Sequence, residues 1–205
     1  MPVVSATIMA NSPLALIVGL GNPGSEYART RHNAGADFVS SLAASCTTTL
    51  KPEARFHGLT ARVLIAGEEV RLLIPQTWMN RSGQAVAAMA GFFKLDAGQI
   101  LLAYDELDLP PGEIRFKLGG GHSGHNGVRD VISALANNRD FHRLRIGIGH
   151  PGHREGVTPH VLSKAAPDER RRIDLCIEEA IRVLPDAVRG NWPIAMNHLN
   201  SYRAE

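Results

Sequence analysis

The chain has 205 residues, of which 44% are hydrophobic, 20% charged and 5% aromatic, and its formal net charge at pH 7 is +2. This composition is typical of a soluble globular protein that can bury a sizeable core, and it excludes collagen-like, disulfide-rich and disordered chains. The small positive charge does not by itself indicate a nucleic-acid partner.

The two cysteines, Cys46 and Cys176, are far apart and form no CxxC motif, so we expect free thiols in a reducing cytoplasm. No apolar run approaches the ~20 residues of a membrane span. The start of the chain lacks the basic and continuous apolar segments of a signal peptide. We expect residues 1–12 to be a poorly ordered extension and residues 13–205 to form a single domain.

Strand and helix patterns alternate in the first part of the chain. Residues 14–20 are apolar and run into Gly, Asn and Pro, which predicts a buried strand and a tight loop. Apolar residues at helical spacing predict a helix over residues 33–46, with Asn33 as its N-cap. Residues 56–66 and 70–75 are rich in β-branched and apolar residues and flank a Gly-Glu-Glu turn, which predicts an antiparallel hairpin.

The alternation continues to the C-terminus. Ser82 is the expected N-cap of the next helix, another helix follows residue 127, and the last long helix is expected over about residues 168–188. Strands are expected at residues 100–104, 113–118 and 144–148. Since strands alternate with helices around one inserted hairpin, the fold class is α/β. We expect a mixed, mostly parallel twisted sheet with helices on both faces.

Polar residues follow several predicted strands, which is where open α/β sheets place their active sites. In chain order, they are Asn22 with His32, Asn80, Asp105 with Asp108, and the glycine-rich loop of residues 119–127, which includes His125 and Asn126. Each of these clusters is a weak signal alone. Four in one chain predict a shared crevice.

His32 can act as a base near neutral pH, because imidazole titrates at about 6.5. A general base contributes roughly 10²–10⁴-fold to a rate, and it works best when a carboxylate holds its tautomer. Asp105, at the tip of an apolar strand, is the best-placed carboxylate. The same pattern also fits a surface histidine and an aspartate in a turn.

The side chains of Asn22, Asn80 and Asn126 can hold a substrate carbonyl or donate to the oxyanion that develops on it. Turn chemistry is the alternative explanation for each asparagine. Lys117 and Arg145 lie on neighbouring predicted strands and could bind a phosphate.

Other site chemistries find little support in the sequence. The loop of residues 119–127 lacks the Lys-Ser/Thr ending of a P-loop, although its glycines could let backbone approach a large ligand. Histidine pairs three residues apart occur twice, but no HExxH motif or accompanying cysteine supports a metal site. A serine nucleophile would need a GxSxG motif, which the sequence does not contain.

Five long motifs resemble those of the bacterial peptidyl-tRNA hydrolases, in the order of that family. They lie at residues 18–35, 75–83, 105–112, 117–127 and 141–151, and the resemblance covers about residues 14–200. It implies a monomeric α/β enzyme without cofactor or metal, which cleaves the ester between a peptide and the 3′ end of tRNA.

The resemblance also implies roles for individual residues. His32 would activate water and Asp105 would orient His32, while Asn22, Asn80 and Asn126 would bind the substrate end and the attacking water. Tyr27 and Met79 would shape the crevice. Lys117 and Arg145 would grip a tRNA phosphate near the acceptor end.

Two other functions remain open on the sequence alone. A non-catalytic RNA-binding relative, similar to plant organelle splicing factors, would present a wide exposed apolar patch to a partner protein. A nucleoside phosphorylase or an aminopeptidase-like hydrolase, suggested only by fold analogy, would depend on phosphate or metal.

Overall fold

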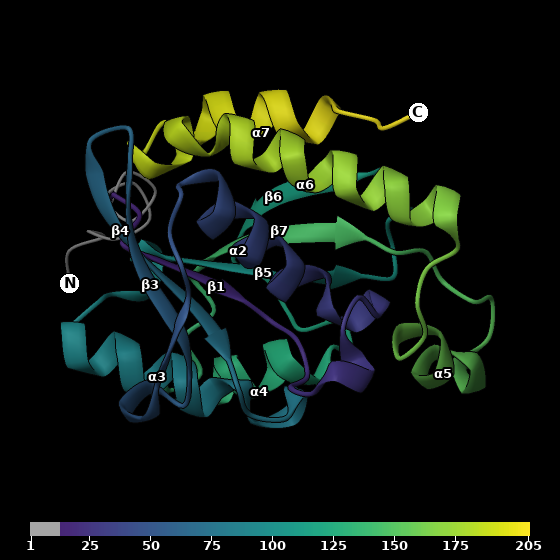
Figure 1. Cartoon of the computed structure of the whole chain (residues 1–205), viewed down its shortest axis with the longest axis horizontal. Coiled ribbons are helices and arrows are strands. Elements are labelled where there is room, and N and C mark those ends of the chain that lie inside the picture. The colour runs from purple at the N-terminus through teal and green to yellow at the C-terminus, as the bar shows by residue number, and fades with distance from the viewer. Residues whose placement is uncertain (1–12) are drawn as a thin grey trace, which may run out of the picture.

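A computed structural model of the chain describes residues 13–205, so the expected extension of residues 1–12 lies outside the described residues. Within the described part, seven strands form one sheet in the order β2-β3-β4-β1-β5-β7-β6 (Figure 1). The strands are β1 Leu16–Gly19, β2 Lys51–Glu53, β3 Gly58–Ile65, β4 Glu68–Pro75, β5 Ile100–Glu106, β6 Ile114–Leu118 and β7 His142–Gly147. The four central strands, β4, β1, β5 and β7, are parallel. Both edges of the sheet are antiparallel, so the expected mixed sheet is confirmed.

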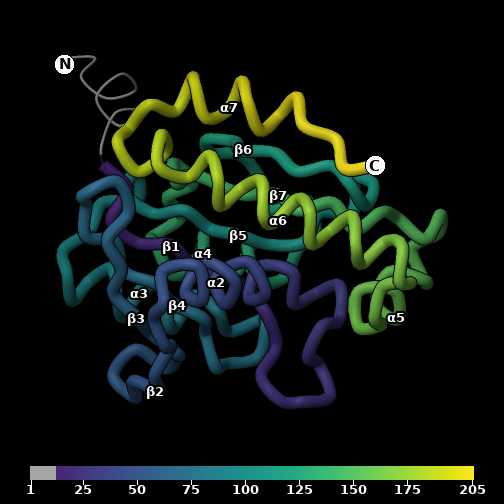
Figure 2. Tube along the Cα trace, turned by 45° about the horizontal axis from the view of Figure 1, so that its top comes forward, coloured from purple at the N-terminus to yellow at the C-terminus, as the bar shows by residue number. Residues whose placement is uncertain are grey.

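Helices cover both faces of the sheet, as expected for the α/β class (Figure 1). They are α2 Ala34–Ser45, α3 Ser82–Phe93, α4 Asn126–Ala134, α5 Val157–Val161, α6 Pro167–Val188 and α7 Trp192–Ser201. Helices α2, α6 and α7 bury one face, and α3 and α4 bury the other. Helix α7 lies beside α6 and over β6 (Figure 2). None of the helices in the described residues is long and apolar enough to cross a membrane.

The alternation of side chains along each strand divides the core into two layers. In β1, Leu16 and Val18 pack with the layer under α3 and α4, while Ile17 packs with the layer under α2 and α6. Every residue of β1 and β5 is buried. Continuous apolar runs of this kind are typical of central parallel strands covered on both faces.

Most predicted elements are confirmed to within about two residues at each end, but one predicted helix cap, Ser82, is wrong. Asn33 is the N-cap residue of α2, as predicted, but its side chain makes no capping hydrogen bond and instead bonds the backbone of Asn22. Ser82 is the first residue of α3, and its hydroxyl donates to the carbonyl of Met79. In both cases the short polar side chain finds a partner in the preceding loop.

Three elements were not predicted from the sequence. Strand β2 has only three residues, all exposed, with a proline at its centre, so it carries no apolar alternation. Helix α5 has five residues, too few to show a helical period. Helix α7 follows α6 after only a short turn at Gly190, and it buries only three residues, Trp192, Ala195 and Leu199.

The direction of β6 changes the path of the glycine-rich loop. Since β6 is antiparallel to β7, its last residue, Leu118, pairs with His142 at the beginning of β7. The loop must therefore return along the sheet before His125 can reach Asp105 near the end of β5. The expected crevice forms, but this loop does not enter it directly from a strand end.

Candidate active site

A cleft lies at the carboxyl ends of β1, β4 and β5, and residues of α5 form part of its wall. It brings together six of the residues that the sequence singled out: Asn22, His32, Met79, Asn80, Asp105 and Asn126. Tyr27, Lys117 and Arg145 are not among the residues that line it. The apolar part of the wall includes Trp78 and Val161.

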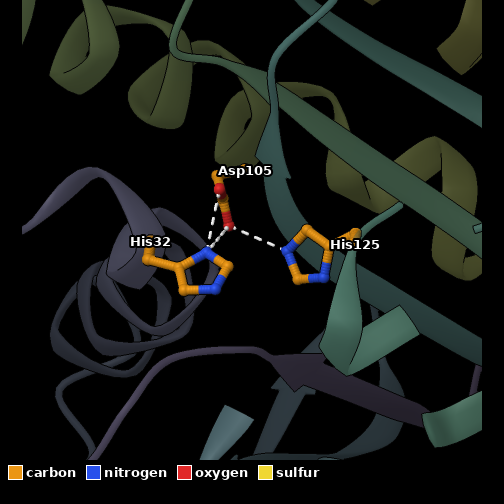
Figure 3. Close-up of side chains that lie close together, drawn as sticks. All are labelled: His32, Asp105 and His125. Carbon is orange, nitrogen blue, oxygen red and sulfur yellow. Dashed lines mark hydrogen bonds and ion pairs between the residues drawn. The ribbon is translucent and has the colours of Figure 1, made fainter. Parts of the chain in front are cut away.

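His32 and Asp105 form the predicted pair. His32 belongs to a single 3₁₀ turn, Arg31–Asn33, just before α2. Its Nδ1 lies 2.9 Å and 3.0 Å from the two carboxylate oxygens of Asp105, which is 3% exposed (Figure 3). A carboxylate in this position holds the proton on Nδ1, so neutral His32 has its lone pair on Nε2.

His125 is a second histidine on the same carboxylate, and the sequence did not identify this role. Its Nε2 lies 2.9 Å from Oδ1 of Asp105, on the opposite side from His32 (Figure 3). Its Nδ1 accepts a hydrogen bond from the backbone N–H of Val128, at 3.3 Å. Since Nδ1 accepts, the proton of neutral His125 is on Nε2 and is donated to Asp105.

Opposing effects set the protonation of this cluster. Burial favours the neutral form of Asp105, but the charges of His32 and His125 and their hydrogen bonds outweigh it, so the pKa of Asp105 lies well below its usual range. Burial would also lower the pKa of His32. The charge and the hydrogen bond of Asp105 overcome that effect, and the pKa of His32 is raised above its ordinary value of 6.5.

Asn22 is held so that only one end of its amide faces the cleft. Its backbone N–H donates to Oδ1 of Asn33 at 2.9 Å, and its carbonyl accepts from Nδ2 of Asn33 at 2.9 Å. The side-chain Oδ1 of Asn22 accepts from the backbone N–H of Met79 at 2.8 Å. Because a backbone N–H needs an acceptor, these contacts identify Oδ1, and the donor Nδ2 of Asn22 is left for a ligand.

The other two asparagines are exposed at the cleft. Asn126 begins α4, and its Oδ1 accepts a hydrogen bond from Arg129. Asn80 lies in the turn that precedes α3. Tyr27 lies at the rim, with its ring edge-to-face with Trp78 at a centroid distance of 5.7 Å. It therefore contacts the cleft wall without lining the cleft itself.

The two basic residues lie on adjacent strands, as predicted. Lys117 in β6 pairs with Arg143 in β7, so Lys117 and Arg145 are diagonal neighbours on one face of the sheet. Lys117 is exposed, whereas Arg145 is half-buried and donates from Nε to Oε2 of Glu106 at 2.8 Å. Burial works against the charge of Arg145, but Glu106 outweighs it and the pKa of Arg145 is raised.

The cluster of His32, Asp105 and His125 has the donor atoms of a metal site, within 4.8 Å of one another. A cation there would have to replace the N–H groups that now bind the carboxylate. In the observed geometry the carboxylate is satisfied by hydrogen bonds to the two histidines.

Comparisons with known proteins agree with the motifs. The family model described as peptidyl-tRNA hydrolase matches residues 16–205. A peptidyl-tRNA hydrolase of Alcanivorax borkumensis is 57% identical over 192 residues, which cover 94% of this chain and 98% of the relative. One of Pseudomonas savastanoi is 56% identical over 191 residues, 93% of this chain and 98% of the relative.

A solved structure supports the same assignment. The crystal structure of peptidyl-tRNA hydrolase from Acinetobacter baumannii superposes with a TM-score of 0.91 at 52% identity, covering 94% of this chain and 97% of that one. High identity, nearly complete mutual coverage and a shared fold agree. The chain belongs to the peptidyl-tRNA hydrolase family.

Proposed function

We propose that this chain hydrolyses the ester between peptide and tRNA in peptidyl-tRNA, the reaction for which its family is named, with His32 as the general base. The observation that carries the proposal is the hydrogen bond from His32 Nδ1 to Asp105. It leaves the Nε2 lone pair of a cleft-lining imidazole to take a proton from water. The sequence of motifs and the family membership support the same reaction.

The steps need no covalent enzyme intermediate. Water loses a proton to Nε2 of His32 as its oxygen adds to the ester carbonyl. The tetrahedral intermediate then collapses, and the ribose oxygen leaves with the proton that His32 returns. The products are a free peptide and a free tRNA.

Asp105 supports both protonation states of His32 in this scheme. It orients the neutral base through Nδ1 and stabilises the imidazolium that forms when water is deprotonated. The raised pKa of His32 reflects that stabilisation.

Asn22, Asn80 and Asn126 bind the substrate end and the attacking water. The orientation of Asn22 supports this role, since its free Nδ2 can donate to a carbonyl oxygen or to the oxyanion. Met79 contributes the backbone N–H that orients Asn22, and Tyr27 supports the wall through Trp78.

Lys117 and Arg145 bind a phosphate near the acceptor end. Two cations on one face of adjacent strands suit a phosphate, and contacts to phosphate position RNA without reading its sequence. We also propose a monomer that works in the cytoplasm without metal. The free thiols of Cys46 and Cys176 fit a reducing compartment.

Hydrolysis of N-acetyl-aminoacyl-tRNA by wild type and by His32→Ala tests the proposal. We expect the variant to lose about 10²–10⁴-fold in kcat while it keeps its fold and tRNA binding. His198→Ala, at an exposed histidine of α7, is the control and should retain activity. EDTA should not change the wild-type rate.

Retained turnover in His32→Ala would remove His32 from the role of base. A wild-type chain that binds tRNA but leaves the ester intact would instead identify the non-catalytic relative. That relative would present a wide exposed apolar patch to its partner. Of the large exposed apolar side chains of the described residues, two line the cleft, Trp78 and Leu162, and the others lie on four different elements: Leu64, Phe92, Leu118 and Ile194.

A further inference from the structure

Two neighbouring carboxylates end strand β5, and both line the cleft. Asp105 binds His32 and His125, and Glu106 binds Arg145. Successive side chains on a strand point in opposite directions, so the two carboxylates bind different partners. Glu106 is 6% exposed, so its charge is withdrawn from water and depends on its partners.

The contacts of Glu106 hold one edge of the Arg145 guanidinium. Oε2 of Glu106 accepts from Nε of Arg145 at 2.8 Å, and Oε1 accepts from the backbone N–H of Asp108 at 3.2 Å. The backbone bond limits the rotation of the carboxylate. Among the described residues, no group accepts a hydrogen bond from the terminal amino groups of Arg145.

This arrangement suits a phosphate. The two terminal amino groups of an arginine form a planar fork that matches two phosphate oxygens. A carboxylate at Nε leaves that fork free and restricts its direction. Without it, the long side chain would have to lose more conformational freedom when the phosphate binds.

We propose that Glu106 is a positioning residue, which directs the terminal amino groups of Arg145 toward a phosphate of the tRNA acceptor end. The inference rests on the phosphate role of Arg145 proposed above. Glu106 and Asp105 are adjacent on one buried strand. The phosphate contact and the catalytic base therefore have a fixed separation, which holds the ester in register with His32.

A simple electrostatic role for Glu106 predicts the opposite result of a mutation. A carboxylate repels a phosphate, so removing its charge would strengthen tRNA binding if charge alone mattered. Removing a positioning group weakens binding. The sign of the change therefore separates the two roles.

The test uses Glu106→Gln, Glu106→Ala, Arg145→Ala and the double variant Glu106→Ala/Arg145→Ala. Each is assayed with N-acetyl-aminoacyl-tRNA and with a short N-acetyl-aminoacyl oligonucleotide that lacks the phosphate contact. Glu106→Ala should raise KM for the full substrate about fivefold to tenfold without changing kcat. It should leave both constants unchanged for the short substrate.

The other variants show whether Glu106 acts through Arg145. The double variant should be no worse than Arg145→Ala alone, because the two residues act as a unit. Glu106→Gln retains an oxygen that can accept from Nε and should recover part of the affinity. Glu113→Gln is the matched control, since Glu113 pairs with Arg115, the cross-strand neighbour of Arg145. It should leave KM unchanged.

Other results would overturn the role of Glu106 or that of Arg145. Tighter tRNA binding by Glu106→Ala, or an equal loss on both substrates, would overturn the positioning role. Weaker binding by Arg145→Ala with no change in Glu106→Ala would overturn it too, while leaving the phosphate role of Arg145 intact. An unchanged KM for Arg145→Ala would overturn the phosphate role itself. Thermal melting of each variant identifies loss of fold.

Discussion

Histidines occupy two very different settings at opposite ends of the parallel strands. His32 and His125 flank Asp105 at the carboxyl end of β5. His142, the first residue of β7, is 1% exposed and stacks on Trp192 with ring centroids 3.5 Å apart and planes within 6°. Neither ring nitrogen of His142 has a hydrogen-bond partner among the described residues.

The two settings move the imidazole pKa in opposite directions. Burial favours the neutral form in both. For His142 nothing opposes burial, and its pKa falls to about 4. For His32 the carboxylate of Asp105 reverses the effect, and the pKa rises above 6.5. A carboxylate partner, rather than the extent of burial, therefore decides whether a buried histidine can titrate near neutral pH.

Replacing Asp105 by Asn should have the largest effect. It removes the charged partner that opposes burial, so His32 becomes a buried histidine more like His142. An amide carries no charge, and it replaces one of the two carboxylate oxygens of this site by an NH2 group that can only donate. We expect kcat to fall by about 10²-fold or more, because His32 loses its tautomer and the imidazolium loses its counter-charge.

The pH dependence gives this prediction a direction. His32 works as a neutral base, so kcat/KM should rise with pH through the His32 pKa, which lies above 6.5 in the wild type. Without the carboxylate, burial alone acts on His32, and this acidic limb should move to lower pH. A pH–rate profile of each enzyme measures the shift. An unmoved limb would exclude the coupling of Asp105 to His32.

Replacing His125 should move the acidic limb of the pH–rate profile to higher pH. The loss of kcat should be smaller than in Asp105→Asn. In His125→Phe the Asp105 carboxylate loses one N–H donor and interacts more strongly with His32, whose pKa should rise further. The ring contact with Tyr104, at a centroid distance of 5.1 Å, can be kept. We expect about a tenfold loss in kcat, at the low end of positioned hydrogen-bonding groups.

His125→Gln is the matched variant, because its amide can still donate to Asp105. It should recover part of the activity and return the acidic limb of the pH–rate profile toward its wild-type position. If both variants behaved alike, the donor function of His125 would be excluded, and its contribution would come from packing.

The sequence predicted the pair of His32 and Asp105 better than the environment of His142. Asp105 could be predicted because it follows an apolar strand, and His32 because it follows a strand-to-loop transition that ends in Asn and Pro. The role of His125 could not be predicted, since it requires β6 to run antiparallel to β7 and the glycine-rich loop to return along the sheet. Strand direction is a tertiary property that local patterns do not carry.

Some of the missed features did leave a signal. Adjacent carboxylates at the end of a strand must face opposite sides, so Glu106 could have been assigned to the face opposite Asp105. Its partner Arg145 could not, because the pairing depends on the register of β5 with β7. His142 alternates with Leu144 and Ile146, which would have placed its ring in the core.

The burial of His142 without a partner should cost folding stability, and the cost should grow as the pH is lowered. Unfolded His142 would bind a proton at about pH 6.5, whereas the folded residue binds one only at about pH 4. Between these values the unfolded state holds more protons, so wild-type stability should fall as the pH is lowered from 6.5 to 4. The loss from this one group would reach about 3 kcal/mol.

His142→Phe keeps an aromatic ring against Trp192 and removes the titration, so its stability should depend less on pH over that range. At pH 7 the change should be neutral or stabilising, because two buried nitrogens without partners are removed. Denaturant unfolding at several pH values measures the difference, with His153→Phe, at an exposed histidine, as the control. A wild type and His142→Phe with parallel pH profiles would show that His142 is protonated equally in both states. Burial without a partner would then not be what separates it from His32.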